Sequence, residues 1–257
     1  MRCLSDKRSL HSEKSPGRKS GEIYLTVRDA RSNFVPRESG GEKRMEAFHF
    51  FAKLDQTLLL GLRATTIQEL LTGIRSVPDA SIYFHTHRFL QQHHFLSPEP
   101  PNDFAYWVTN VMGDDALAEL LWSVDPVRFD GISGLREKLI GVLESYLDST
   151  ERRIECAAGE EFYFMACKTF VLPTGHSART LGEFAELVGK VSINSVYFHV
   201  FDAKMRLKSG ENDFSRWFRD QGKTALANET RRLDPYSYTL EGLRRQIVAL
   251  VKKYDSH

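Results

Sequence analysis

Residues 81–85 of the chain read Ser-Ile-Tyr-Phe-His, and residues 195–199 read Ser-Val-Tyr-Phe-His. The similarity extends further, because residues 46–85 align with residues 160–199 without a gap and 14 of these 40 positions are identical. About two or three identities would be expected by chance at ordinary composition. The sequence therefore predicts one structural unit that occurs twice, as an internal duplication.

A further motif downstream matches at a slightly shorter spacing. Asn102-Asp103-Phe104 in the first copy corresponds to Asn212-Asp213-Phe214 in the second. Each unit therefore spans about 100 residues, the usual size of a small domain. We predict a tail at residues 1–44, copy A at residues 45–147, a linker at residues 148–159 and copy B at residues 160–257.

Both copies show the same order of expected elements. Alternating large residues, Phe48 and Phe50 in the first copy, indicate a short strand. Thr66 and Glu69 have the spacing of a capping box, which predicts a helix start, and the second copy repeats it. Helical periodicity follows to the end of each copy. The predicted fold is mainly α with a minor β part, built as two tandem copies of a strand-plus-four-helix unit about a pseudo-twofold axis.

The charges are balanced overall, with 35 basic and 34 acidic side chains, but unevenly distributed. Residues 1–44 hold 11 Lys or Arg against 6 Asp or Glu, which is typical of a disordered basic tail. The remaining body is mildly acidic, so we expect no binding to nucleic acid. No apolar stretch has the length of a signal peptide or membrane span, and the three cysteines have no paired spacing. We therefore expect a cytoplasmic protein.

Histidines are concentrated in one short segment, since four of the nine lie within residues 85–94. On a helix, His87, Gln91 and His94 project along one line. His87 and His94 are then candidate ligands for a divalent metal ion, with Glu99 or Asp103 completing the set. The alternative is a polar helix face without a metal, so the sequence leaves the cofactor unknown.

The two copies share one histidine of this segment. His85 corresponds to His199, whereas His87 has no histidine counterpart. The shared histidines are expected to be buried imidazoles that hydrogen-bond to a carboxylate, Asp103 in one half and Asp213 in the other. The catalytic alternative uses the same residues, with His85 as a general base that Asp103 orients.

The loop after these histidines is four residues longer in the first copy than in the second. Prolines at positions 98, 100 and 101 stiffen it. We predict that this region contacts an unidentified protein or small-molecule ligand. The candidate contact residues are Arg88, Gln91, Phe95 and Glu99.

One long motif also carries a resemblance to a known family. The run is His-Thr-His-Arg-Phe-Leu-Gln-Gln-His-His-Phe-Leu-Ser-Pro-Glu-Pro-Pro-Asn-Asp-Phe-Ala-Tyr-Trp at residues 85–107, with Asn212-Asp213-Phe214 and Leu233-Asp234-Pro235-Tyr236 downstream. It resembles a bacterial family known only as a domain of unknown function, over residues 45–252. The resemblance implies a bacterial, cytoplasmic protein and supplies no activity, cofactor or catalytic residue.

Two classes of function remain open from the sequence. The first is an internally duplicated helical binding or regulatory module. The second is a metal-dependent or His-carboxylate hydrolase-like enzyme that uses the histidine cluster of the first copy. No nucleophile elbow, phosphate-binding glycine loop, dinucleotide fingerprint or paired-cysteine metal site favours a more specific activity. We therefore expect a binding module and keep the enzyme as the alternative.

Overall fold

The structure is a computed structural model of the whole chain, and it describes residues 24–26, 46–92, 102–150, 154–204, 210–233 and 238–256. The elements in chain order are β1 (Tyr24–Thr26), β2 (Phe48–Ala64), α1 (Ile67–Ser76), α2 (Asp79–Gln92), α3 (Asp103–Asn110), α4 (Asp115–Trp122), the 3-10 turn η2 (Pro126–Arg128), α5 (Ile132–Ser149), β3 (Phe162–Ala178), α6 (Leu181–Lys190), α7 (Ile193–Tyr197), the π-helical turn η3 (Phe198–Asp202), α9 (Asp213–Asp220), α10 (Thr224–Arg231) and α11 (Leu240–Asp255).

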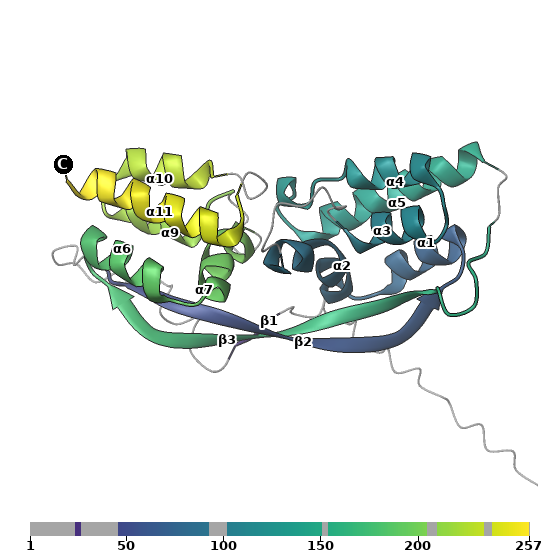
Figure 1. Cartoon of the computed structure of the whole chain (residues 1–257), viewed down its shortest axis with the longest axis horizontal. Coiled ribbons are helices and arrows are strands. Elements are labelled where there is room, and N and C mark those ends of the chain that lie inside the picture. Colours follow the sequence, from purple (N-terminus) through teal and green to yellow (C-terminus); the bar gives the residue numbers. More distant parts are fainter. Residues whose placement is uncertain are drawn as a thin grey trace, which may run out of the picture.

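Two long antiparallel strands, β2 and β3, form a ribbon along the whole molecule (Figure 1). The pairing is symmetric about its middle, where Asp55 lies opposite Thr169. The register shifts near both ends of the ribbon, between His49 and Phe51 and again between Leu59 and Arg63. The three residues of β1 pair in parallel with β3, so the strand order is β1-β3-β2. β1 lies within the segment predicted as a tail, and the rest of that segment lies outside the described residues.

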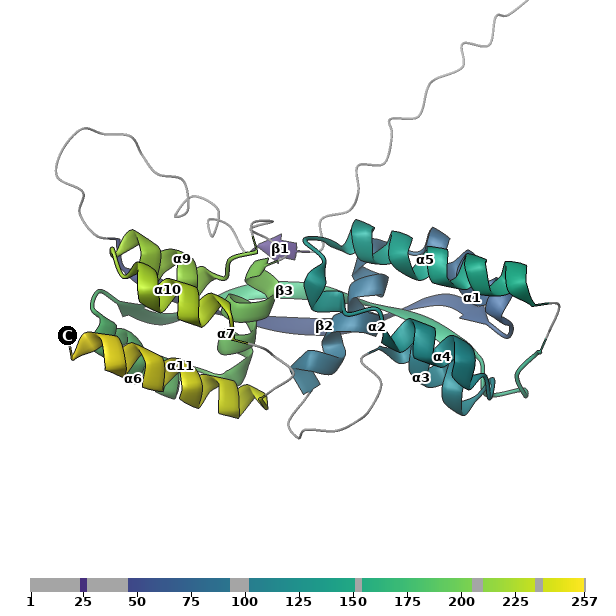
Figure 2. The ribbon, with the colours of Figure 1, turned by 90° about the horizontal axis from the view of Figure 1, so that it is seen from above.

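All the described helices cover the same face of the ribbon, in two separate groups (Figure 1). Helices α1 to α5 lie over one end and helices α6 to α11 over the other, as the view from above also shows (Figure 2). We call the face under the helices the inner face and the opposite one the outer face. Each group of helices has its own hydrophobic core.

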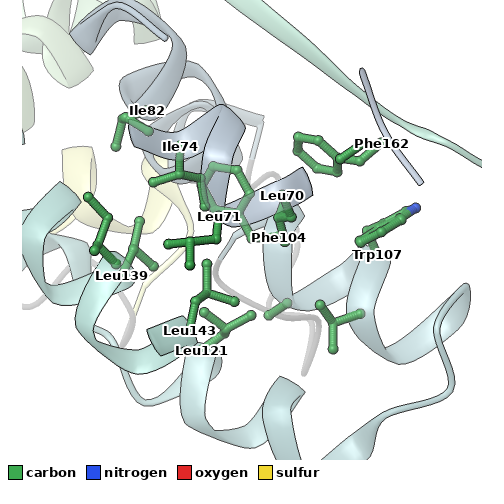
Figure 3. Packing of buried hydrophobic residues seen from close by; sticks show 14 of the residues in the cluster. Leu70, Leu71, Ile74, Ile82, Phe104, Trp107, Leu121, Leu139, Leu143 and Phe162 are labelled. Atoms are coloured by element: carbon green, nitrogen blue, oxygen red, sulfur yellow. The ribbon is translucent and has the colours of Figure 1, made fainter. Parts of the chain in front are cut away.

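The two halves exchange the first residues of their strands. Phe162 and Phe164, which begin β3, are buried in the core of α1 to α5. Phe162 lies there beside Phe104 and Trp107 (Figure 3). Phe164 packs so closely on α1 that a Cβ at Gly73 would lie 2.2 Å from its Cζ atom. The phenylalanines that begin β2 are buried in the opposite core, so each group of helices encloses a strand segment of the other half.

The predicted arrangement as two tandem strand-plus-four-helix units was therefore wrong. The chain is mainly helical, but neither core is built from one copy alone, because the strands are 17 residues long and reach from one core to the other. The helix count also differs, since Gly113 and Gly222 adopt φ of +62° and +75° and separate α3 from α4 and α9 from α10. A positive φ interrupts helical geometry and favours glycine.

The predicted helix starts at Thr66 and Thr180 are confirmed. Each threonine hydroxyl accepts a hydrogen bond from the backbone N–H three residues later, at 3.2 Å. The Glu69 carboxylate accepts in turn from the backbone N–H of Thr65, at 2.8 Å, and this hydrogen bond lowers its pKa. Together these bonds satisfy donors that a helix start leaves free.

Candidate functional site

A buried cation lies at the middle of the ribbon, on the inner face. The side chain of Lys53 on β2 is fully buried, and its Nζ atom lies 2.9 Å from Asp55 Oδ2 and 3.1 Å from Asp202 Oδ2. The same Nζ atom lies 4.7 Å from the ring centroids of both Tyr83 and Tyr197. A buried charge is tolerated only when it is paired and hydrogen-bonded. We call these five residues the central cluster.

Hydrogen bonds of the central cluster connect five elements, β2, β3, α2, α7 and η3. The Tyr83 hydroxyl on α2 accepts from Lys53 and donates to Asp202 Oδ1, at 2.6 Å. The Tyr197 hydroxyl on α7 donates to the backbone carbonyl of His87, at 2.9 Å. Thr169 on β3 donates to Asp55 Oδ1, at 2.5 Å. The cluster therefore connects the two strands to helices of both halves at the place where the halves meet.

Electrostatics hold the lysine in its charged form. Burial acts to lower the pKa of Lys53, but the charges of Asp202 and Asp55 outweigh it and leave the pKa above its usual value. Burial also raises the pKa of Asp202, against the attraction of Lys53. On the neighbouring strand, burial raises the pKa of the Cys167 thiol to about 11. Since the thiolate is the reactive form of cysteine, Cys167 is a poor nucleophile at neutral pH.

His87, predicted as a metal ligand, lies against the central cluster. Its ring stacks on Tyr83 with a centroid distance of 5.1 Å, and its Nδ1 atom lies 2.8 Å from the Thr86 hydroxyl. Burial, and after it the charge of Lys53, lowers the pKa of His87 to about 3. The imidazole is therefore neutral at physiological pH. Its predicted co-ligand His94 lies outside the described residues, within which no group of three or more metal-binding side chains occurs.

His85 and His199 are each fixed from two sides. Nδ1 of His85 lies 2.8 Å from Asp103 Oδ2, and Nδ1 of His199 lies 2.8 Å from Asp213 Oδ2. The Nε2 atom of each histidine accepts a backbone N–H, His85 from Met165 and His199 from a residue of β2. An Nε2 that accepts carries no proton, so Nδ1–H donates to the carboxylate. Both ring nitrogens are thus in use.

These contacts cross from one half to the other. His85 binds β3, and His199 binds Phe51 on β2. The indole N–H of Trp107 likewise donates to the Glu160 carbonyl at 2.8 Å, and that of Trp217 donates to a carbonyl just before β2 at 2.9 Å. Residues that the two copies share therefore hold the exchanged strands in place.

The predicted contact residues are only partly described. Arg88 is half-buried; its Nη1 atom donates to the Thr57 hydroxyl at 3.0 Å, and its guanidinium lies 4.6 Å from the Phe84 ring centroid. Gln91 is a residue of α2 whose side chain is not described. Phe95 and Glu99 lie outside the described residues, like the rest of the longer loop.

The sequence interpretation missed Lys53, Asp55 and Asp202. Alternation from Phe48 and Phe50 places even-numbered residues inward, but the register shift before Phe51 turns Lys53 and Asp55 to the inner face. A comparison of equivalent positions in the two copies could have indicated two of these residues. Lys53 corresponds to Cys167, and Asp202 corresponds to Arg88, so charges change between the copies at these sites.

No helix among the described residues is long and apolar enough to cross a membrane. OrfY from Thermoproteus tenax, whose structure has been solved, is similar to this chain with a TM-score of 0.69 and 31% sequence identity. The match covers 82% of this chain and 97% of OrfY. No curated protein matches the sequence. The family described as "Family of unknown function (DUF5752)" matches residues 45–252, and the chain therefore belongs to this family.

Proposed function

We propose that the chain is a binding module that contacts a partner protein through the outer face of its ribbon, on the β2 side. Alternation from the inward Lys53 and Asp55 places Leu54 and Leu58 on that outer face. Leu54 is 58% exposed and Leu58 is 39% exposed. Exposed apolar side chains grouped on one surface mark interaction sites more often than singly scattered ones do.

The difference between the strands carries this proposal. Leu54 and Leu58 lie four residues apart on the outer face of β2, and we call them the β2 leucine row. The equivalent positions of β3 are Lys168 and Leu172. Only β2 therefore presents two leucines there. Packing does not explain the leucine at position 54, where the matched strand has a lysine, because Leu54 is 58% exposed.

Accessibility supports binding over catalysis. The ammonium of Lys53 is sealed among two carboxylates and two tyrosines. His85 and His199 use both ring nitrogens, so a general-base role requires breaking an existing hydrogen bond. In our proposal these polar groups hold the ribbon rigid, and a rigid surface binds at a lower entropic cost.

Two further features belong to the same proposal. The matched positions of the halves fit an origin by internal duplication, followed by divergence at the central cluster and in the β2 leucine row. Cys156 and Cys167 form no disulfide, which fits a reducing bacterial cytoplasm as the place of action.

Site-specific photo-crosslinking in cells tests the proposal. A photoreactive phenylalanine analogue placed at position 54 should form a covalent adduct with another protein. The matched control is position 120, because Leu120 is similarly exposed at 48% but lies on α4, on the helix side. Adducts of equal yield at both positions, or at position 120 alone, would overturn the proposal.

A further inference from the structure

One edge of β2, the one that faces away from β3, pairs with no strand of the described residues. In the three-stranded sheet β3 is the central strand. An open edge presents backbone N–H and C=O groups that can pair with another extended chain. Many peptide-binding proteins use an edge in this way.

At the opposite edge of the sheet, an edge of this kind already pairs with a short parallel strand. There β1 pairs in parallel with β3, with Tyr24 opposite Thr169 and Thr26 opposite Val171. The positions of β2 equivalent to residues 169–171 are residues 55–57. Because the ribbon is symmetric about the pair of Asp55 and Thr169, these two edge segments present their backbones in the same way. The molecule thus has two equivalent edges, of which β1 occupies one.

We infer that the edge of β2 at residues 55–57 binds an extended segment of a partner protein, which adds as a fourth strand parallel to β2. This inference rests on the proposed function, and it specifies the mode of binding. The partner strand would pair with β2 as β1 pairs with β3. Main-chain hydrogen bonds would supply affinity, and side chains at alternate positions would supply specificity.

The side chains beside this edge define the partner's chemistry. Leu54, Gln56 and Leu58 alternate on the outer face, and all three are exposed. In a parallel pairing centred on Gln56, the partner places one side chain beside each of them. The partner segment should therefore carry apolar side chains at two positions four residues apart, with a residue of any type midway between them.

A second copy of the chain would gain less than a different protein by binding at the edge of β2. Each chain has one β1 and two equivalent edges. Moving β1 from its own β3 to the β2 of another chain therefore creates no additional pairing. A strand from a different protein adds pairing without losing any. The chain's own segment is nevertheless a suitable probe, because Leu25 opposite Gln56 would put Ile23 beside Leu54 and Val27 beside Leu58.

The experiment uses the full chain and a fluorescein-labelled peptide with the sequence of residues 20–30, Ser-Gly-Glu-Ile-Tyr-Leu-Thr-Val-Arg-Asp-Ala. Fluorescence anisotropy should show saturable binding of one peptide per chain. Leu58→Lys should weaken binding by about tenfold or more, because it places a flexible charge beside an apolar side chain. A peptide with Asp at both apolar positions, 23 and 27, should not bind.

Leu172→Lys is the matched control, since position 172 of β3 is equivalent to position 58 and Leu172 is 42% exposed. It should leave peptide binding unchanged. Melting temperatures of both variants should stay within about 2 °C of the wild type, because both sites are on the surface.

Three results would overturn the inference. The first is no peptide binding to the wild type. The second is loss of binding in Leu172→Lys but not in Leu58→Lys, which would mean that the peptide displaces β1 from β3. The third is a wild-type dimer that Leu58→Lys converts to a monomer, which would make a second copy the occupant of the edge. Photo-crosslinking at position 54 is independent of these results. Adducts that persist without peptide binding would leave the proposed function standing and reject the added strand.

Discussion

We expect His87 to make the protein less stable in weak acid than at neutral pH. Replacing His87 by Phe should remove most of this loss of stability. Phe occupies the equivalent position of the second half, at residue 201, so the aromatic shape has a precedent in the same fold. The imidazole is buried, stacks on Tyr83 and hydrogen-bonds to Thr86. Protonation of such a ring in the folded state is opposed by burial and by the nearby charge of Lys53.

The magnitude follows from the two pKa values. An unfolded histidine has a pKa near 6.5, whereas that of His87 in the folded protein is about 3. Because the folded pKa is depressed, stability is fully present above about pH 6.5 and is lost progressively as the pH falls towards about 3. Each pH unit well inside this window costs about 1.36 kcal/mol, so the loss between about pH 7.5 and pH 5 is about 2 kcal/mol.

Urea unfolding followed by tryptophan fluorescence measures this loss in both proteins. At pH 7.5 the Phe variant should be less stable by about 1 kcal/mol, the usual value of one hydrogen bond. Between pH 7.5 and pH 5 the wild type should lose about 2 kcal/mol more than the variant. All other titrating groups are present in both proteins and cancel in the comparison. Parallel pH profiles would refute the reasoning, since they would mean that His87 takes up its proton without unfolding.

Two further predictions concern the carboxylates that pair with Lys53 and with the two shared histidines. Lys53→Met should cost about 3–5 kcal/mol in urea unfolding because it leaves the buried Asp202 carboxyl without its cationic partner, and adding Asp202→Asn should restore part of that loss. A double variant no more stable than the single one would contradict this pairing. His199→Leu should cost more than His85→Leu, since the Asp213 side chain is only 2% exposed whereas the Asp103 side chain is 51% exposed and can be solvated. Equal losses in the two variants would contradict that reasoning.

Local patterns predicted much of the structure, but not how the halves combine. The helix starts at Thr66 and Thr180 follow from capping residues that act within one turn. The exchange of strands does not follow, because Phe48 and Phe162 occupy equivalent positions of the repeat. An apolar pattern that is the same in both copies fits either core equally well. Distinguishing the two arrangements requires the length and path of the ribbon, which depend on long-range pairing.

The central cluster could not be predicted from the sequence, for a related reason. A register shift of one strand against another reverses which side chains face inward, and no local pattern in the first copy marks where it occurs. The sequence therefore places Lys53 outside, although it is the most deeply buried charge of the ribbon. The burial of His85 and His199, in contrast, was predictable, because both copies carry a histidine at this position and a shared residue is expected to have a structural role.

The position of Lys53 explains why the two halves differ where they meet. Its ammonium lies equally far from Tyr83 and Tyr197, which are equivalent residues, so it lies between the halves. If both halves carried this lysine, two ammonium groups would compete for the same buried space, and like charges in such a site repel strongly. With Cys167 at the equivalent position, one cation remains, and Asp202 replaces the arginine of the other half to pair with it. A homodimer of one unit must repeat each charge at its axis. Two diverged units in one chain can place a cation and its carboxylates there instead, and this asymmetric pair fixes the two halves in one mutual arrangement.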